Sequence, residues 1–351
     1  MRTPVARAAL VATAGLLALA TAGLAACGGA DGQAGGEAGD RKITVYSGRS
    51  ESLVKPVLEE FQKASGVKVE VRYGDTAAIA AQLLEEGERS PADVFLAQDA
   101  GALGAVAKKG LFATLPTAVL DKVPAGYRDR AGQWVGVTGR SRVLVYNADQ
   151  VPAADLPKSV FELTGPKWRG RVGIAPTNGS FQAFVTALRV QHGDAKTRDF
   201  LTGLKANGVQ IRESNPLIVS DVNTGKLAAG LVNHYYVYNR AKEDGTTVDA
   251  LKARLHFFPD GDTGALVNVS GVGVLKPAAS DPDVRALVDY LLSQPAQTYF
   301  AEKTFEYPLA SGVPTAPGLP ALSSIKAPAV NLNDLDTLQA TIAMIKEVGL
   351  A

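Results

Sequence analysis

The stretch ITVYSGRS at residues 43–50 joins a strand pattern to the start of a helix, and the fold class follows from how this unit repeats. Residues 43–46 alternate as in a β-strand, and residues 50–65 carry apolar side chains at helical spacing up to Gly66. Two further strand–helix pairs follow, with strands at 67–71 and 92–96 and helices at 77–87 and 100–109. This order predicts an α/β fold with a parallel sheet, helices on both faces and ligands beyond the carboxyl ends of the strands.

The rest of the chain extends this pattern into a second lobe and then returns. Strands are predicted at 134–137 and 143–146 with a loop at 138–142 between them, and further strands at 171–174, 229–232, 266–269 and 271–275. A chain that leaves its first lobe and comes back builds two doubly wound lobes around a cleft. We expect residues 41–138 with 268–316 in lobe 1 and 139–267 with 317–351 in lobe 2. Hinge crossovers are expected near Val137 and Thr138 and near residues 266–269.

The first 40 residues indicate export. Residues 1–27 have a basic start and a short apolar stretch, and they end in LAAC, which resembles a bacterial lipobox. We therefore expect a lipoprotein signal peptide with lipid attachment at Cys27; the alternative is an ordinary signal peptide with an incidental cysteine. Residues 28–40 are rich in Gly, Ala and acidic residues and predict a flexible tether. The mature protein is expected outside the cytoplasm, anchored to the cell membrane by lipid alone.

Composition excludes several functions. The formal net charge is +1, which gives no electrostatic footprint for nucleic acid. The chain has 1 cysteine, so neither an intramolecular disulfide nor a thiolate zinc site is expected. Its 3 histidines show no metal-ligand spacing. No nucleophile–base pair stands out, so an enzyme is not expected.

The segment NHYYVYN at residues 233–239 carries the most distinctive chemistry. A phenolate is a hard oxygen donor, and a hard trivalent cation such as Fe³⁺ prefers such donors to imidazole or thiolate. The alternative is that these tyrosines are core or surface aromatics of a helix.

Seven motifs in order make the chain resemble the extracytoplasmic ferric-ion-binding proteins that serve ABC importers. They are VYSGRS at 45–50, SPADVF at 90–95, GRSRVLVYN at 139–147, PKWRG at 166–170, NHYYVY at 233–238, GALV at 264–267 and EYPL at 306–309. The resemblance runs from about residue 43 to residue 309. It implies a type II periplasmic-binding-protein fold, a hinged clamp of two lobes, and Fe³⁺ as the cargo, bound with carbonate or phosphate.

The resemblance also implies the ligands on the second lobe. Tyr235 and Tyr236 match the paired tyrosines that bind iron in the family. Asn215 and Asn233 match asparagines that hold the anion, and Thr138, Gly139 and Arg140 match a loop whose backbone N–H groups face it. Each asparagine alone could instead be a turn residue that satisfies the local backbone.

The first lobe departs from the family pattern. Ser50 stands where some members carry histidine, and Gln98 stands where others carry glutamate. Asp99 occupies a place where some members use glutamine to contact the anion, so its carboxylate would repel phosphate unless it binds the metal. These three residues are possible metal or anion contacts. Three arginines, Arg49, Arg140 and Arg142, add guanidinium groups that can bind an anion, unless they are solvated or engaged in ion pairs.

The sequence therefore predicts a monomeric Fe³⁺ receptor that delivers iron to an ABC permease and its ATPase. The alternative is a receptor for a small anionic organic solute, such as a phosphonate or a sugar phosphate, on the same fold.

Overall fold

The computed structural model describes residues 41–351, in which ten strands form one mixed sheet. The predicted signal peptide 1–27 with Cys27 and the tether 28–40 lie outside the described residues. The strands are β1 Lys42–Ser47, β2 Lys68–Tyr73, β3 Val94–Ala97, β4 Trp134–Asn147, β5 Val172–Ile174, β6 Gln210–Ile211, β7 Ala229–Asn233, β8 Ala253–His256, β9 Val267–Val274 and β10 Tyr307–Pro308. Their order is β2-β1-β3-β9-β4-β7-β5-β6, and β8 and β10 pair with β4.

The helices follow the predicted alternation, with several additions that the periodicity did not reveal. They are α1 Glu51–Ser65, α2 Thr76–Glu86, α3 Ala100–Lys108, α4 Thr117–Leu120, α5 Gly179–His192, α6 Asp194–Ala206, α7 Asn215–Asn223, α8 Tyr235–Glu243, α9 Pro282–Leu291, α10 Gln294–Tyr299 and α11 Leu338–Val348. The sequence did not predict α7 as a helix, because it is short and Pro216 stands in its first turn. Pro is tolerated there, since the first N–H groups of a helix have no partner within it.

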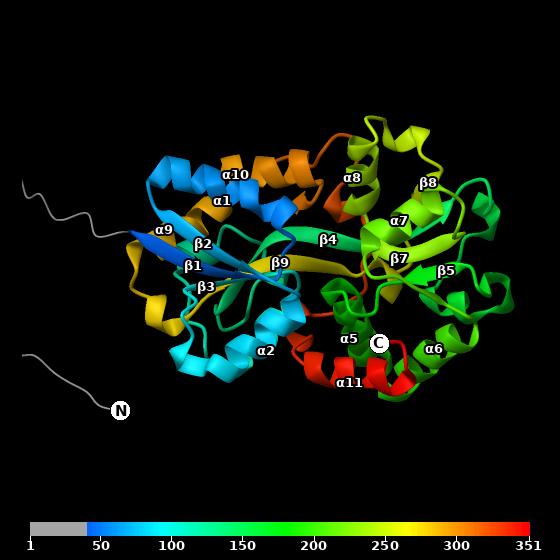
Figure 1. Ribbon diagram of the computed structural model, residues 1–351, viewed down its shortest axis with the longest axis horizontal. Helices are drawn as coiled ribbons and strands as arrows, with labels where there is room; N and C mark the ends of the chain where they lie inside the picture. Colours follow the sequence, from blue (N-terminus) through cyan, green and yellow to red (C-terminus); the bar gives the residue numbers. More distant parts are fainter. Residues whose placement is uncertain (1–40) are drawn as a thin grey trace, which may run out of the picture. The chain divides into compact units, whose positions relative to one another are not determined.

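The first part of the sheet confirms the parallel βαβ units. Strand β1 pairs in parallel with β2 and with β3, so the carboxyl ends of β1 and β3 lie at the same edge. Helix α1 buries Val54, Val57, Leu58 and Phe61, and it packs against α9. Helices α1 and α10 lie on one side of these strands and α2 lies on the other (Figure 1). The residues that follow β1 and β3 are therefore held together at one edge.

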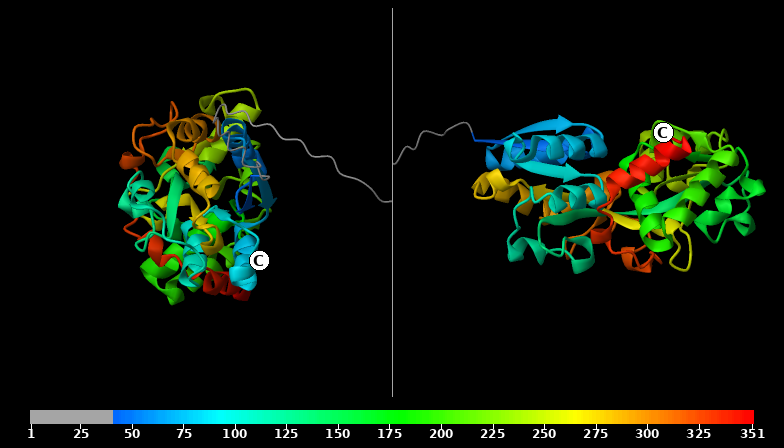
Figure 2. Two further views of the ribbon diagram at one scale, coloured as in Figure 1. Left: turned by 90° about the vertical axis from the view of Figure 1, so that its left-hand side faces the viewer. Right: turned by 90° about the horizontal axis from the view of Figure 1, so that it is seen from below.

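The middle of the sheet is antiparallel, because β3, β9, β4 and β7 alternate in direction. Strand β4 is long: residues 134–141 pair with β9, and residues 142–146 pair with β7. Beyond it, β5 runs parallel to β7 and β6, with α5, α6, α7 and α8 around them (Figures 1 and 2). The C-terminal helix α11 packs mainly against α5 and α6. The division into two lobes at the stated boundaries stays a prediction.

Two secondary-structure predictions are wrong. The strands expected at 266–269 and 271–275 form a single strand, β9. Residues 138–142 were expected to form a loop, but they continue β4 without interruption. The physical reason is that both edges of this stretch are occupied, with β9 on one side and β10 on the other. A bulge between Gly136 and Thr138 absorbs the irregular pattern that suggested a loop.

No helix among residues 41–351 is both long enough and apolar enough to cross a membrane.

Candidate functional site

The paired tyrosines stand where β7 passes into α8. Strand β7 ends at Asn233, and α8 begins at Tyr235, so both phenols belong to the first turn of the helix. Their ring centroids are 4.2 Å apart. Tyr235 is 0% exposed and its hydroxyl has no hydrogen-bond partner among residues 41–351. A buried polar atom without a partner is rare and requires a reason, such as an absent ligand. Tyr236 is only partly buried and lines the adjacent cavity.

The surroundings keep Tyr236 protonated until a cation arrives. Burial raises the pKa of Tyr236 well above its usual value, and the Tyr235 phenol adds to this effect, whereas Asn215 and Arg49 oppose it. The guanidinium groups of Arg49 and Arg142 both lie close enough to interact with the two phenols. A bound metal ion strongly lowers the pKa of its ligands. Metal binding here would therefore release phenolic protons.

His234 precedes the pair but is fully engaged in structural hydrogen bonds. Its Nδ1 accepts the backbone N–H of Ser141 at 3.2 Å, and its Nε2 donates to the carbonyl of Phe305 at 2.8 Å. Burial lowers the pKa of His234 to about 4, so the ring is neutral at physiological pH. With both nitrogens occupied, His234 positions the tyrosines rather than binding a metal.

A cavity of about 310 Å³ lies between the ends of β1 and β3 and the beginnings of α7 and α8. It brings together Ser50, Gln98, Asn215 and Tyr236, four of the residues that the sequence singled out. Its other lining residues are Gly48, Arg49, Glu51, Tyr73, Gly74, Asp75, Asn178, Glu213, Ser214 and Pro216. Three of them, Glu51, Asp75 and Glu213, are exposed carboxylates, which the sequence reasoning did not identify. The cavity therefore offers the hard oxygen donors that a trivalent cation prefers.

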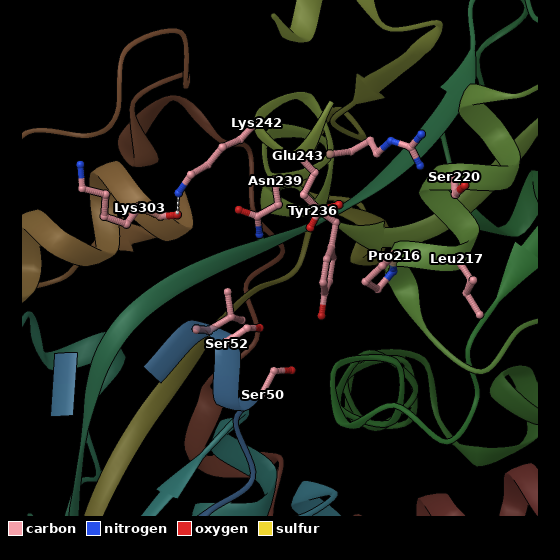
Figure 3. Close-up of a pocket in the computed structure, with 12 residues that line it drawn as sticks. Ser50, Ser52, Pro216, Leu217, Ser220, Tyr236, Asn239, Lys242, Glu243 and Lys303 are labelled. Carbon is pink, nitrogen blue, oxygen red and sulfur yellow. Dashed lines mark hydrogen bonds between the residues drawn. The ribbon is translucent and has the colours of Figure 1, made fainter. Parts of the chain in front are cut away.

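A second, larger hollow of about 600 Å³ adjoins this cavity and shares Ser50, Pro216 and Tyr236 with it. Figure 3 shows Tyr236 extending from α8 toward the Ser50 side, with Asn239 and Lys242 above it. The Lys242 ammonium donates to the carbonyl of Lys303 at 3.2 Å. This hollow gives Tyr236 access to solvent.

Two walls of the cavity can now be defined. The first wall comprises Ser50 and Gln98, which line the cavity at the ends of β1 and β3, and the adjoining Asp99, which is buried and does not line it. Thr76 holds these ends together, because its hydroxyl donates to the carbonyl of Gly48 at 2.8 Å and accepts the N–H of Gln98 at 3.4 Å. The second wall comprises Asn215 and Tyr236, which line the cavity, and Asn233 and Tyr235, which are buried and do not line it.

The first wall also carries an amide and a carboxylate group. Gln98 donates to the side-chain oxygen of Asn178 at 3.4 Å. Asp99 is 1% exposed; its Oδ1 accepts the N–H of Ala102, whereas its Oδ2 has no partner among the described residues. Burial raises the pKa of Asp99 to about 6, and the Ala102 N–H and Arg140 oppose this rise. The carboxylate is therefore charged at neutral pH.

The Asn215 amide, at the start of α7, also lines the cavity. It is 1% exposed, and neither its oxygen nor its nitrogen has a hydrogen-bond partner in the described part of the chain. The interpretation of Asn215 as a turn residue that satisfies local backbone is therefore not supported.

Two of the three arginines are engaged by a buried glutamate. Arg49 donates to Glu306 at 2.6 Å, and the Arg140 Nε lies 3.7 Å from the other carboxylate oxygen. Glu306 is 0% exposed and follows Phe305, whose φ of 59° turns the chain after a π-helix. Such helices are frequent at functional sites. The ion-pair alternative thus holds for Arg49 and Arg140. No pattern in the sequence indicated a role for Glu306.

Arg142 instead connects the end of β7 with the first turn of α5. Its Nη2 donates to the carbonyl of Leu231 at 2.9 Å, and its Nη1 lies 3.3 Å from the Ser180 hydroxyl and 3.4 Å from the Asn233 oxygen. Burial lowers the pKa of Arg142 to about 9, and the positive charge of Arg140 adds to the effect. A buried cation without a carboxylate partner favours an anion nearby.

Two of the residues predicted to face the anion, Thr138 and Gly139, do not lie in a loop. Thr138 and Gly139 lie inside β4 with strands on both sides, so their backbone N–H groups face neighbouring strands and not an open loop. An anion cradle of another kind is present at the start of α5, which runs for 14 residues. Asn178 caps this helix by accepting the N–H of Ser180 at 3.0 Å. The sequence signal was PTNGS at 176–180, in which an N-cap residue and Gly precede an amphipathic stretch.

The class of protein follows from family comparison together with this geometry. Residues 89–337 match the family model described as bacterial extracellular solute-binding protein. The chain belongs to this family of solute-binding transport proteins, which are not enzymes.

Within this family, the chain is similar to several ferric-iron-binding proteins. The chain is 33% identical over 312 residues to the Fe(3+)-binding periplasmic protein of Serratia marcescens, covering 89% of this chain and 91% of the relative. It is 33% identical over 313 residues to the major ferric iron-binding protein of Neisseria meningitidis serogroup B, covering 88% and 93%. The iron-bound structure of HitA from Pseudomonas aeruginosa matches with a TM-score of 0.83 and 35% identity, covering 88% of this chain and 99% of HitA. The predicted resemblance and the type II periplasmic-binding-protein fold are confirmed.

Proposed function

We propose that this protein captures Fe³⁺ outside the cytoplasm through Tyr235 and Tyr236 and delivers it to an ABC permease and its ATPase. The observation that carries the proposal is the buried hydroxyl of Tyr235, which has no hydrogen-bond partner among residues 41–351. The Tyr235 ring centroid lies 4.2 Å from that of Tyr236, which lines the cavity. Two phenols side by side provide two anionic oxygens once a cation displaces their protons. The relatives that cover most of the chain are described as ferric-iron-binding proteins.

The first wall completes the site when the proposed lobes close. Ser50 and Gln98 supply neutral oxygens, and Glu51, Asp75 and Glu213 border the same cavity. An accompanying carbonate or phosphate would place its charge near the start of α5, where Arg142 and Asn233 meet, and near the buried amide of Asn215. Arg140 would act on this anion through its charge, since its backbone lies within β4.

Closure is proposed to occur about the strands that link the two predicted lobes, near residues 137–138 and 266–269. Supporting this, β4 carries a bulge between Gly136 and Thr138, and its pairing partner changes from β9 to β7 a few residues further on. A few residues at such a change can absorb a hinge rotation.

The test is a metal analysis with an absorbance spectrum of the purified protein. Phenolate-to-iron charge transfer should colour the iron-loaded protein, and the Tyr235→Phe, Tyr236→Phe double variant should be colourless. Iron bound stoichiometrically without this band would refute the proposal. Raised thermal stability with a phosphonate or sugar phosphate, and none with Fe³⁺, would favour the anionic-solute receptor instead.

The lipid anchor at Cys27 and a monomeric state belong to the same proposal. Mass spectrometry of the protein from membranes should find a diacylglyceryl modification on the first mature residue. A Cys27→Ser variant should be recovered in the soluble extracytoplasmic fraction.

A further inference from the structure

The Asp99 carboxylate, beside the first wall, is a buried charged group that is only partly hydrogen-bonded among residues 41–351. Its Oδ1 caps its own helix α3, and its Oδ2 is buried without a hydrogen-bond partner in the described part of the chain. Buried charges in proteins are normally paired or hydrogen-bonded, because isolated burial is costly. The position of Oδ2 therefore indicates what stabilises it.

The unpartnered oxygen lies against the first turn of α5. A Cβ built on Gly179 would stand only 2.9 Å from Asp99 Oδ2, so the absence of a side chain at Gly179 permits this approach. Gly179 is the first residue of the helix, where the helix dipole is positive and N–H groups are not used within the helix. The carboxylate thus stands where a helix start favours an anion.

This contact is closed from the cavity. Gln98 and Asn178 line the cavity, whereas Asp99 and Gly179 do not, and both are buried. Thr76 also abuts this point, because its Cβ would lie 3.4 Å from a Cβ on Gly179. With the carboxylate in this position, a second anion at the same helix start would meet both a filled space and a like charge.

We propose that Asp99 is a resident anion of this site: its carboxylate takes the position at the start of α5 that an external carbonate or phosphate would occupy. The protein then captures Fe³⁺ without a requirement for phosphate. This inference rests on the proposed function and replaces the external anion of that proposal with a group from the chain itself. It also gives Asp99 a positioning role, because its carboxylate lies between the start of α3 and the start of α5.

The experiment measures Fe³⁺ uptake from ferric nitrilotriacetate by the charge-transfer band, in buffer depleted of carbonate, with and without added phosphate or bicarbonate. We expect the affinity of the unaltered protein to change little with either anion. In Asp99→Asn, which keeps the helix-capping oxygen but removes the charge, added phosphate should strengthen iron binding about tenfold or more. Asp281→Asn is the matched control, because Asp281 also caps a helix, α9, away from the cavity.

Two further measurements separate this role from a structural one. Without iron, inorganic phosphate should raise the melting temperature of Asp99→Asn but not of the unaltered protein. In Gly179→Ala the added Cβ would displace the carboxylate, so that anion-independent iron binding should weaken while the far-ultraviolet spectrum stays native.

The outcomes are distinguishable. A band that grows with phosphate as strongly in the unaltered protein as in Asp99→Asn overturns this inference alone. Equal phosphate dependence in Asp281→Asn also overturns it. No band with any anion overturns the proposed function, and this inference with it.

Discussion

The two walls of the cavity are built from the same kind of element, the carboxyl end of a strand, yet they carry different chemistry. The second wall presents two phenols and two amides, and its Tyr235 hydroxyl and Asn215 amide are buried without geometric hydrogen-bond partners among residues 41–351. The first wall presents an exposed hydroxyl at Ser50, an amide at Gln98 and a carboxylate at Asp99 that is already turned toward α5. The difference indicates that the second wall captures the metal and the first wall closes on it.

The largest effect is expected when the phenols are removed, which tests whether the second wall captures the metal. The double variant Tyr235→Phe, Tyr236→Phe should lose Fe³⁺ affinity by more than the roughly 100-fold that loss of a group supporting a ligand costs. Phenylalanine keeps the ring packing and removes only the oxygens. Competition with citrate, followed by absorbance, gives the affinity.

Tyr238→Phe is the control for this variant. Tyr238 belongs to the same helix, but its hydroxyl donates to the carbonyl of Gly318 at 2.9 Å, away from the cavity. The affinity of the Tyr238→Phe variant for iron should be unchanged. An equal loss in both variants would show that the effect is structural.

A second test addresses what holds the first wall in place. Removing the carboxylate with Glu306→Ala should lower the free energy of unfolding by about 3–5 kcal/mol, because Arg49 and Arg140 would be left as uncompensated buried charges. Urea denaturation of the apo protein measures this. The exposed pair Lys63–Glu60 is the comparison, and Glu60→Gln should cost no more than about 1 kcal/mol. Similar losses for both variants would contradict the assignment of Glu306 as a buried support.

How much of this could be predicted from the sequence depends on the range of the interactions. The pattern of residues 43–109 revealed the βαβ units, because strand and helix periods are local. The pairing of β4 with β10 is set by residues 307–308, far along the chain, and so the loop expected at 138–142 was wrong. The start of α5 carried a local capping signal at Asn178 but no sign that Asp99 lies against Gly179.

In the candidate site, too, local motifs were visible in the sequence, whereas contacts between distant residues were not. Tyr235 and Tyr236 were identified because two adjacent tyrosines are visible in one motif, and their role remains a prediction. Glu306 was visible as part of EYPL, but its pairing with Arg49 joins residues 257 positions apart. No spacing rule can supply such a contact, since it depends on the whole fold.

Lowering the pH should weaken Fe³⁺ binding by the phenols of the second wall. Burial holds the pKa of Tyr236 above its usual value, so the phenol is protonated in the apo protein and must lose that proton to bind Fe³⁺. Metal affinity therefore falls as pH falls, by up to roughly 100-fold per pH unit when both phenols release a proton. Absorbance titrations with a competing chelator at several pH values give this slope. In Tyr236→Phe the slope should drop to about tenfold per unit, because one displaced proton remains. An affinity independent of pH would argue against phenolate ligands.

The smallest expected effect concerns the first wall, where a better donor can be added rather than removed. Ser50→His places an imidazole at the exposed start of α1, on the cavity side opposite Tyr236. Because a ligand on the closing wall gains its contact only when the walls meet, the variant should bind Fe³⁺ more tightly by about tenfold and release it more slowly. Stopped-flow transfer of iron to a chelator measures the release, and Ser52→His on the same helix is the control. If the two histidines had equal effects, the gain would reflect general charge near the mouth and the first wall would not contribute a ligand from position 50.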